Sequence, residues 1–184
     1  MKKLIVALAA AAIGVTVNAA SFSWQAQKGY IYDGADTPAK LTSGSAYLVF
    51  TSALTQSDLV TAYAADAATA ASTVAAKSVS TGSITSNSRI DGTEFSADVT
   101  ADQTAYFVVF NGDNMYVSIT ADVPYLAVGT SEFAFASVTS SSKAFNDVAG
   151  GYAGAGWYGA VPEPTSGLLM LLGMAGLALR RKRA

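Results

Sequence analysis

The stretch that decides the fold runs from Ala105 to Thr120 and reads AYFVVFNGDNMYVSIT. Residues 105–110 form an uninterrupted apolar run rich in aromatic and β-branched side chains, which is typical of a strand buried on both faces. The Asn-Gly pair at 111–112 is a strong hairpin signal, because a tight hairpin turn needs positive φ angles that these residues adopt easily. Residues 115–120 then alternate between apolar and polar, which predicts a partner strand with one exposed face. The stretch therefore predicts a β-hairpin within an antiparallel sheet.

Residues 46–50 form a second apolar run and predict another central strand. Weaker strand patterns occur at four other places, namely 22–28, 30–32, 93–99 and 132–138. The Ser/Thr-rich segment 78–92 is typical of a loop, with a turn at Asp91-Gly92.

Residues 57–77 have the pattern of one alanine-rich helix. Ser57 is suited to cap its first turn. Apolar residues recur every three or four positions along one face, namely Leu59, Tyr63, Ala67, Ala70 and Val74. The expected fold class is α+β, with a mostly antiparallel β-sheet domain, one Ala-rich helix and a C-terminal transmembrane helix.

The composition of the 184 residues limits the functions that the chain can have. It contains no histidine and no cysteine, which excludes thiol catalysis, disulfides and the usual general base. Between residues 20 and 161, five Lys and Arg stand against twelve Asp and Glu, so this part carries a formal charge of −7. Such an acidic body argues against nucleic-acid binding. We predict no enzymatic activity, no cofactor and no metal site.

Residues 1–19 are typical of a secretory signal peptide. Lys2 and Lys3 precede an apolar run that ends in small residues, so we expect signal peptidase to cut between Ala19 and Ala20. The alternative is a retained N-terminal anchor, which the short apolar run and the polar residues after it disfavour. The chain is therefore expected to be exported, with a β-rich exported domain at residues 20–149.

Residues 150–160 are rich in glycine and predict a flexible tether. Residues 161–184 have three parts: the motif Pro162-Glu163-Pro164, the apolar run 167–179 and the basic cluster Arg180-Arg181-Lys182-Arg183. The prolines hold the backbone extended. The apolar run predicts a short transmembrane helix, and the basic cluster is expected to stop translocation and stay in the cytoplasm.

These three parts, in this order, resemble the PEP-CTERM sorting signal of Gram-negative bacteria. The resemblance covers only the last two dozen residues. It implies that exosortase, a membrane-embedded processing enzyme, recognises Pro162-Glu163-Pro164, that residues 167–179 anchor the chain in the inner membrane in transit, and that the basic cluster retains it there. It also implies delivery to the cell envelope, the cell surface or an extracellular polysaccharide matrix. A Gram-positive sortase signal needs Leu-Pro-x-Thr-Gly, which residues 161–165 lack.

Two groups of acidic residues could carry other chemistry, and each has a simpler interpretation. Asp33-Gly34-Ala35-Asp36 and Asn111-Gly112-Asp113-Asn114 offer oxygen ligands, but neither has the ligand spacing of a calcium loop, so turns are favoured. Asp91, Glu94 and Asp98 lie close together in the sequence. A strand would place Glu94 and Asp98 on one face, either as a carboxylate pair for glycoside hydrolysis or as a solvated strand face.

Five aromatic residues invite a sugar-stacking hypothesis, namely Trp24, Tyr30, Tyr32, Trp157 and Tyr158. The alternative for Trp24 is a place in the core, and Trp157 lies in the predicted tether. We therefore expect a structural or adhesive protein of the envelope or matrix. The alternative is a carbohydrate-binding module of the exopolysaccharide matrix, which would make polysaccharide a partner.

Overall fold

The computed structural model describes residues 20–27, 29–32, 39–97, 99, 101, 103–126, 129–135, 138–139, 145–146 and 151–159. The helices are α1 (Gln56–Ala65) and α2 (Ala67–Lys77). The strands are β1 (Ala20–Ala26), β2 (Gly29–Tyr30), β3 (Ser45–Phe50), β4 (Ser80–Ile84), β5 (Ile90–Gly92), β6 (Phe95–Ala97), β7 (Gln103–Asn111), β8 (Asn114–Val117), β9 (Ala121–Val123), β10 (Thr130–Ala134), β11 (Val138–Thr139), β12 (Phe145–Asn146) and β13 (Gly156–Gly159).

One sheet of eleven strands makes up most of the described chain, in the order β10-β1-β5-β4-β3-β7-β8-β13-β12. Strand β6 also pairs with β1, and β9 also pairs with β7. The neighbours in this sheet are antiparallel except β1–β10 and β12–β13. The predicted α+β class with a mostly antiparallel sheet is therefore confirmed.

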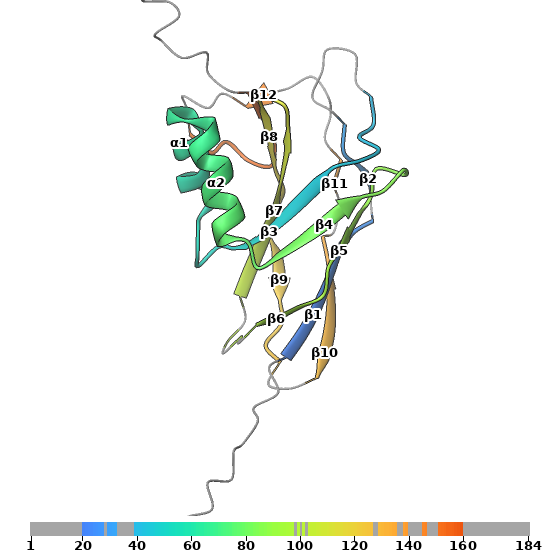
Figure 1. Ribbon diagram of the computed structural model, residues 1–184. Coiled ribbons are helices and arrows are strands. Elements are labelled where there is room, and N and C mark those ends of the chain that lie inside the picture. The colour runs from blue at the N-terminus through green and yellow to red at the C-terminus, as the bar shows by residue number, and fades with distance from the viewer. Residues whose placement is uncertain are drawn as a thin grey trace, which may run out of the picture.

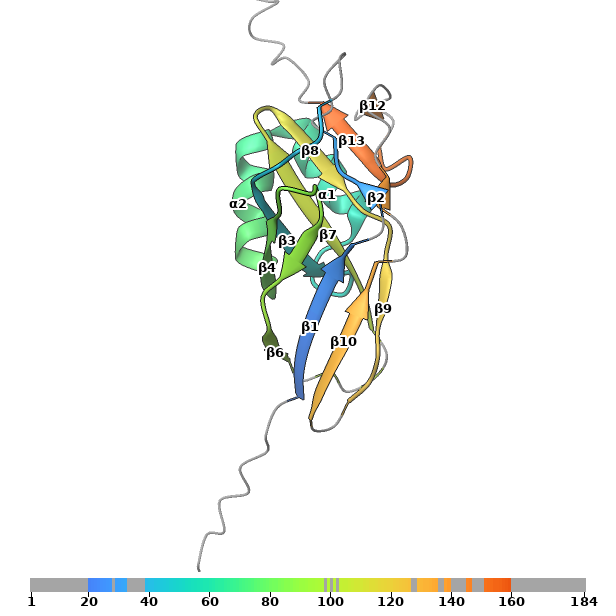
Figure 2. The ribbon, with the colours of Figure 1, turned by 90° about the vertical axis from the view of Figure 1, so that its right-hand side faces the viewer.

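The sheet curls, so that β1 and β10 lie over the central strands β3 and β7 (Figure 2). The ring of Trp24 on β1 lies 5.9 Å from that of Phe107 on β7, although these strands are not neighbours in the sheet. The two helices cover the other face of the central strands (Figure 1). The central strands are thus buried on both faces, as the apolar runs predicted.

Two cores follow from the alternation of side chains along these strands. Ala105, Phe107 and Val109 point into the core between β1 and the central strands, which we call the inner core. Tyr106 and Val108 point into the core under the helices, which we call the helix-side core. Both sets are almost completely buried, so β7 contributes to both cores along its length.

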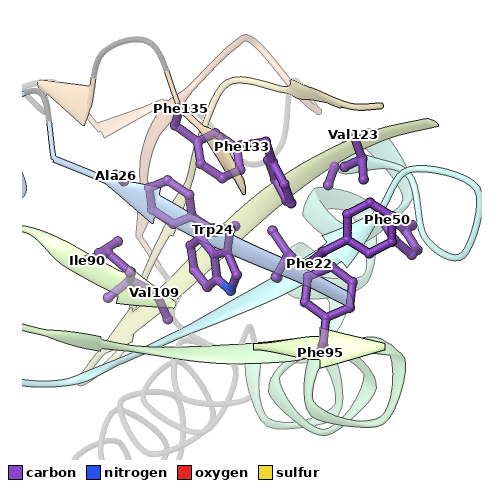
Figure 3. Close-up of a cluster of buried hydrophobic side chains, with 14 of the residues drawn as sticks. Phe22, Trp24, Ala26, Phe50, Ile90, Phe95, Val109, Val123, Phe133 and Phe135 are labelled. Carbon is purple, nitrogen blue, oxygen red and sulfur yellow. The ribbon is translucent and has the colours of Figure 1, made fainter. Parts of the chain in front are cut away.

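Trp24 lies in the middle of the inner core, as Figure 3 shows. Its Nε1 donates a hydrogen bond of 3.0 Å to Ser80 Oγ, and its ring meets Phe135 edge to face at 6.0 Å. A Cβ on Gly92 would lie 2.2 Å from the indole nitrogen. Glycine at this position therefore provides the space that the indole fills.

The segment 78–92, which was predicted to be a loop, contains strands β4 and β5. In β4, Ser80, Gly82 and Ile84 point inward while the residues between them are exposed. This strand alternation is not visible as a hydrophobic pattern, because most of the residues are serine, threonine or glycine. Gly82 and Gly92 lie where the Trp24 ring approaches β4 and β5. The predicted turn at Asp91-Gly92 is likewise part of β5 and not a turn.

The prediction of one helix at 57–77 is wrong, because the chain forms two helices that meet at Asp66. Asp66 has an extended backbone, with φ −159° and ψ 109°, and its carboxylate accepts hydrogen bonds from the backbone N–H groups of Ala68 and Thr69. A residue that caps a new helix in this way competes with continuation of the previous one. The first cap is also misplaced, since Thr55 and not Ser57 caps α1.

Two further expectations are wrong at the other end of the sheet. Strand β8 was expected to be half exposed, but Met115 faces the helix-side core and Tyr116 the inner core. The segment 150–160 was expected to be a flexible tether, but residues 156–159 form β13 along the edge of β8. Trp157 is buried in the inner core and Tyr158 in the helix-side core. Their burial stabilises the strand although glycines flank them.

Among the residues that the structure describes, no helix is long and apolar enough to cross a membrane. The predicted transmembrane run 167–179 lies outside the described residues.

Candidate functional site

The residues of the predicted sorting signal lie outside the described part of the chain, namely Pro162, Glu163, Pro164, Arg180, Arg181, Lys182 and Arg183. Ala19, on one side of the predicted signal-peptide cut, is also outside it. Ala20, on the other side, is the first residue of β1, is 2% exposed and pairs with Ala97 of β6. A cut between Ala19 and Ala20 would therefore leave β1 whole.

The aromatic residues proposed for sugar stacking do not form a surface platform. Trp24 and Trp157 are each 1% exposed and Tyr158 is fully buried. Tyr32 is half-buried, and its backbone forms an isolated bridge with Lys40. The side chain of Tyr30 lies outside the described residues. The structure thus assigns three of the five rings to the cores, where a sugar cannot reach them.

Three buried tyrosine side chains on the helix side of the domain donate hydrogen bonds to backbone carbonyl groups. The Tyr158 hydroxyl donates to Gly154 O at 2.6 Å, and Tyr106 donates to Leu54 O at 3.0 Å. Tyr63 on α1 donates to the carbonyl oxygen of Asp113. Burial, with a smaller contribution from the Asp113 charge, raises the pKa of Tyr63 to about 12. This phenol therefore stays protonated and keeps its donor at neutral pH.

Residues 111–114 form the predicted turn. Asn111 pairs with Asn114 across the β7–β8 hairpin, and Gly112 has a φ of 56°, as a tight turn requires. The second candidate turn, 33–36, lies outside the described residues. Within the described ranges no three His, Cys, Asp or Glu side chains come together in a way that could hold a metal ion.

Two of the three acidic residues near position 94 lie among the described residues. Glu94 precedes β6, Asp91 lies on β5 and accepts a hydrogen bond of 3.3 Å from Gln27, and Asp98 is outside the described residues. The prediction that Glu94 and Asp98 share one face of a strand therefore stays untested. The structure instead brings Glu94 to the same groove as Glu132 of β10.

This groove, which we call the polar groove, crosses β1 and has a volume of about 310 Å³. Its lining consists entirely of hydroxyl and carboxyl side chains, from Ser21, Ser23, Glu94, Thr130, Ser131 and Glu132. The register explains the grouping, since Ser21 lies beside Thr130, and Ser23 beside Glu132, in the parallel β1–β10 pair. The groove can offer hydrogen-bond acceptors and hydroxyl groups but no positive charge.

Neighbouring side chains orient both carboxylates of the polar groove. Ser21 Oγ donates to Glu94 Oε1, and Gln25 Nε2 donates to Glu132 Oε1. We did not identify this grouping from the sequence, although the alternation of Ser21, Ser23 and Gln25 with buried residues marks a polar face of β1. The pairing of β1 with β10, far away in the sequence, is not visible in any local pattern.

A second hollow, of about 440 Å³, lies at the junction of α1 and α2. Alanines 64, 65, 67, 68 and 71 line it together with Tyr63, Asp66, Phe110, Gly112 and Asp113. Three hydrogen bonds hold the Asp66 carboxylate, from the Thr69 hydroxyl and the N–H groups of Thr69 and Ala68, and they lower its pKa below the ordinary value. Asp66 is therefore engaged in capping α2, and most of the side chains that line the hollow beside it are small.

The polar groove and the last described residue, Gly159, lie at opposite ends of the domain. Strands β1 and β10 begin at the lower end in Figure 2, whereas β13 ends at the upper end, beside the β7–β8 turn. Gly159 pairs there with Asn114. The chain therefore leaves the described domain, toward residue 160, at the end away from the polar groove.

A PEP-CTERM protein-sorting motif matches residues 160–183 of the chain. The match confirms the resemblance drawn from the Pro-Glu-Pro motif, the apolar run and the basic cluster. It supports an exported protein that exosortase processes during its transit through the membrane. Comparison with curated proteins and with solved structures finds no match for the chain.

Proposed function

We propose that the chain is a structural or adhesive protein of the cell envelope, cell surface or extracellular matrix, without catalytic activity. The observation that carries this proposal is the sorting motif at 160–183, which directly follows a folded domain. The largest aromatic side chains of that domain are used to build its two cores. A domain of this kind serves as a stable, exported body that the sorting machinery delivers.

The proposed route uses both ends of the chain. Signal peptidase removes residues 1–19, so that the exported domain begins with β1. Residues 167–179 then anchor the chain in the inner membrane, with Arg180-Arg181-Lys182-Arg183 on the cytoplasmic side. Exosortase recognises Pro162-Glu163-Pro164 and releases the domain toward its destination. A cut at this position keeps every residue of β1, including the pairing of Ala20 with Ala97, in the mature chain.

Replacing Pro162, Glu163 and Pro164 with alanine tests the route. We expect the full-length variant to accumulate unprocessed in the inner membrane, because the recognition motif is gone while the apolar run remains. Immunoblots of fractionated cells measure this, and alanine at Thr165 and Ser166 is the matched control. Wild-type processing and location in the triple variant would contradict the proposal.

The second candidate function is carbohydrate binding, and the polar groove favours it. Hydroxyl and carboxyl groups can exchange hydrogen bonds with sugar hydroxyls, and Ser21 and Gln25 already orient the two carboxylates. Strands β1 and β10, which carry the groove, begin at the end of the domain away from Gly159, the last described residue before the sorting motif, so an anchored chain would present the groove outward. Recognition would rest on hydrogen bonds and not on the buried aromatic rings.

Neutralising both carboxylates tests this second candidate. We expect Glu94→Gln with Glu132→Gln to weaken retention of the domain on matrix polysaccharide at least tenfold, since a hydrogen bond to a charged group contributes about 1.5–3 kcal/mol. Co-sedimentation with purified polysaccharide is the measurement. The control, Asp58→Asn with Asp113→Asn, removes the same charge near the helices. Equal retention of both double variants and the wild type would remove the groove from consideration.

A further inference from the structure

A row of three carboxylates follows the outer face of β1, and we call it the acidic row: Asp91, Glu94 and Glu132. This face points away from the central strands, which lie behind β1 in Figure 2. Each carboxylate accepts a hydrogen bond from a neutral side chain on β1 or directly after it, namely Ser21 for Glu94, Gln25 for Glu132 and Gln27 for Asp91. The residue steps from Ser21 to Gln27 span about 20 Å of extended chain. The acidic row therefore extends beyond the polar groove, which Glu94 and Glu132 line.

The acidic row carries negative charge without a cation among its hydrogen-bond partners. In the described part of the chain its donors are a serine and two glutamines, and the lining of the polar groove contains no Lys or Arg. All three carboxylates belong to exposed residues. Like charges held side by side repel one another, and a surface of one sign raises the local concentration of ligands of the other sign. A cationic ligand therefore complements this face.

The pairing of β1 determines how such a ligand can be recognised. Both edges of the strand are already paired, with β10 on one side and with β5 and β6 on the other. An extended peptide that joins a sheet needs a free strand edge, so recognition at the acidic row depends on side chains. The side chains between the carboxylates carry hydroxyl groups, namely Ser21, Ser23 and Thr130. Hydroxyl groups both donate and accept hydrogen bonds, as those of sugars do, so the face suits a chain of sugars.

We propose that the acidic row binds a polysaccharide with free ammonium groups, that is, a polymer of deacetylated amino sugars. Its ammonium groups lie against the carboxylates, and its hydroxyl groups bond to the serine and threonine side chains between them. The bonds from Ser21, Gln25 and Gln27 each reach one oxygen of a carboxylate, so the other oxygen accepts from an ammonium group. This proposal rests on the carbohydrate-binding candidate above and names the class of polymer.

Acetylation of the polymer tests the proposal without changing the protein. Beads of polyglucosamine and the same beads after N-acetylation present one sugar backbone with and without its ammonium groups. At a pH of about 6, where carboxylates are ionised, we expect the full chain in a non-ionic detergent to be retained on the unacetylated beads and released by salt. Retention there should exceed that on the acetylated beads about tenfold, the combined effect of a few exposed ion pairs. Equal retention on both would overturn this proposal and leave the carbohydrate-binding candidate standing. No retention on either would overturn both.

Two double variants of the full chain locate the binding on the protein. Asp91→Asn with Glu132→Gln removes two charges of the acidic row, and we expect about fivefold weaker retention on the unacetylated beads. The matched control, Asp58→Asn with Asp113→Asn, removes the same charge near the helices and should bind as the wild type does. Equal losses in both would assign retention to net charge and overturn the proposal. Stronger retention of the wild type on polylysine beads of equal ammonium density would assign the row to a basic polypeptide and also overturn it.

Discussion

Replacing Trp24 with alanine should lower the free energy of unfolding of the domain by about 3–5 kcal/mol, the usual cost of removing a buried tryptophan. The side chain is 1% exposed and contacts rings from the central sheet and from the segment after β10. Its loss would also leave Ser80 Oγ without the indole donor, inside a core that Gly82 and Gly92 shape around the ring. Chemical denaturation followed by tyrosine and tryptophan fluorescence measures the effect.

Trp24→Phe is the control for this prediction, because it keeps most of the apolar volume while it loses part of the ring and the hydrogen bond to Ser80. We expect an intermediate loss of stability from this variant. The same pair separates a core role from a binding role. If Trp24→Ala abolished polysaccharide retention while the melting temperature stayed at the wild-type value, the residue would act in binding and its assignment to the core would be wrong.

The strands that were predicted correctly are those in which bulky apolar side chains follow one another along the sequence, because such side chains indicate burial on both faces. Residues 46–50 and 105–110 lie in β3 and β7. Strands with aromatic and β-branched residues on both faces are stable at the centre of a sheet, where both faces are covered. The hairpin after β7 was also predicted, since an Asn-Gly pair between two strand-like runs is typical of a tight hairpin turn. Local sequence was sufficient in these places.

The missed strands depend on partners that are distant in the sequence. Nothing within 78–92 shows that Trp24 needs glycine at positions 82 and 92, so a Ser/Thr-rich strand looks like a loop. The same reason hid the polar groove, because Glu94 and Glu132 meet only through their separate contacts with β1. The break at Asp66 is a different case, since aspartate before alanines is a local cap signal that one continuous apolar face concealed.

Deleting β13 should unfold the domain, although this segment looks like a tether. A chain of residues 20–155 loses Trp157 and Tyr158, one from each core, at roughly 3–5 kcal/mol for each large ring. The sum is comparable to the whole stability of an ordinary domain, about 5–15 kcal/mol. Circular dichroism in the near ultraviolet, where packed aromatic rings give signals, should show the loss of fixed packing.

A chain of residues 20–159 is the matched control, because it lacks the sorting motif and keeps β13. We expect it to melt cooperatively at the temperature of the full exported domain. Trp157→Phe in this chain should cost much less than Trp157→Ala, since Nε1 of Trp157 has no hydrogen-bond partner among the described residues and little but ring volume is lost. If the 20–155 and 20–159 chains melted alike, residues 156–159 would be a tether after all, and the assignment of Trp157 and Tyr158 to the two cores would be wrong.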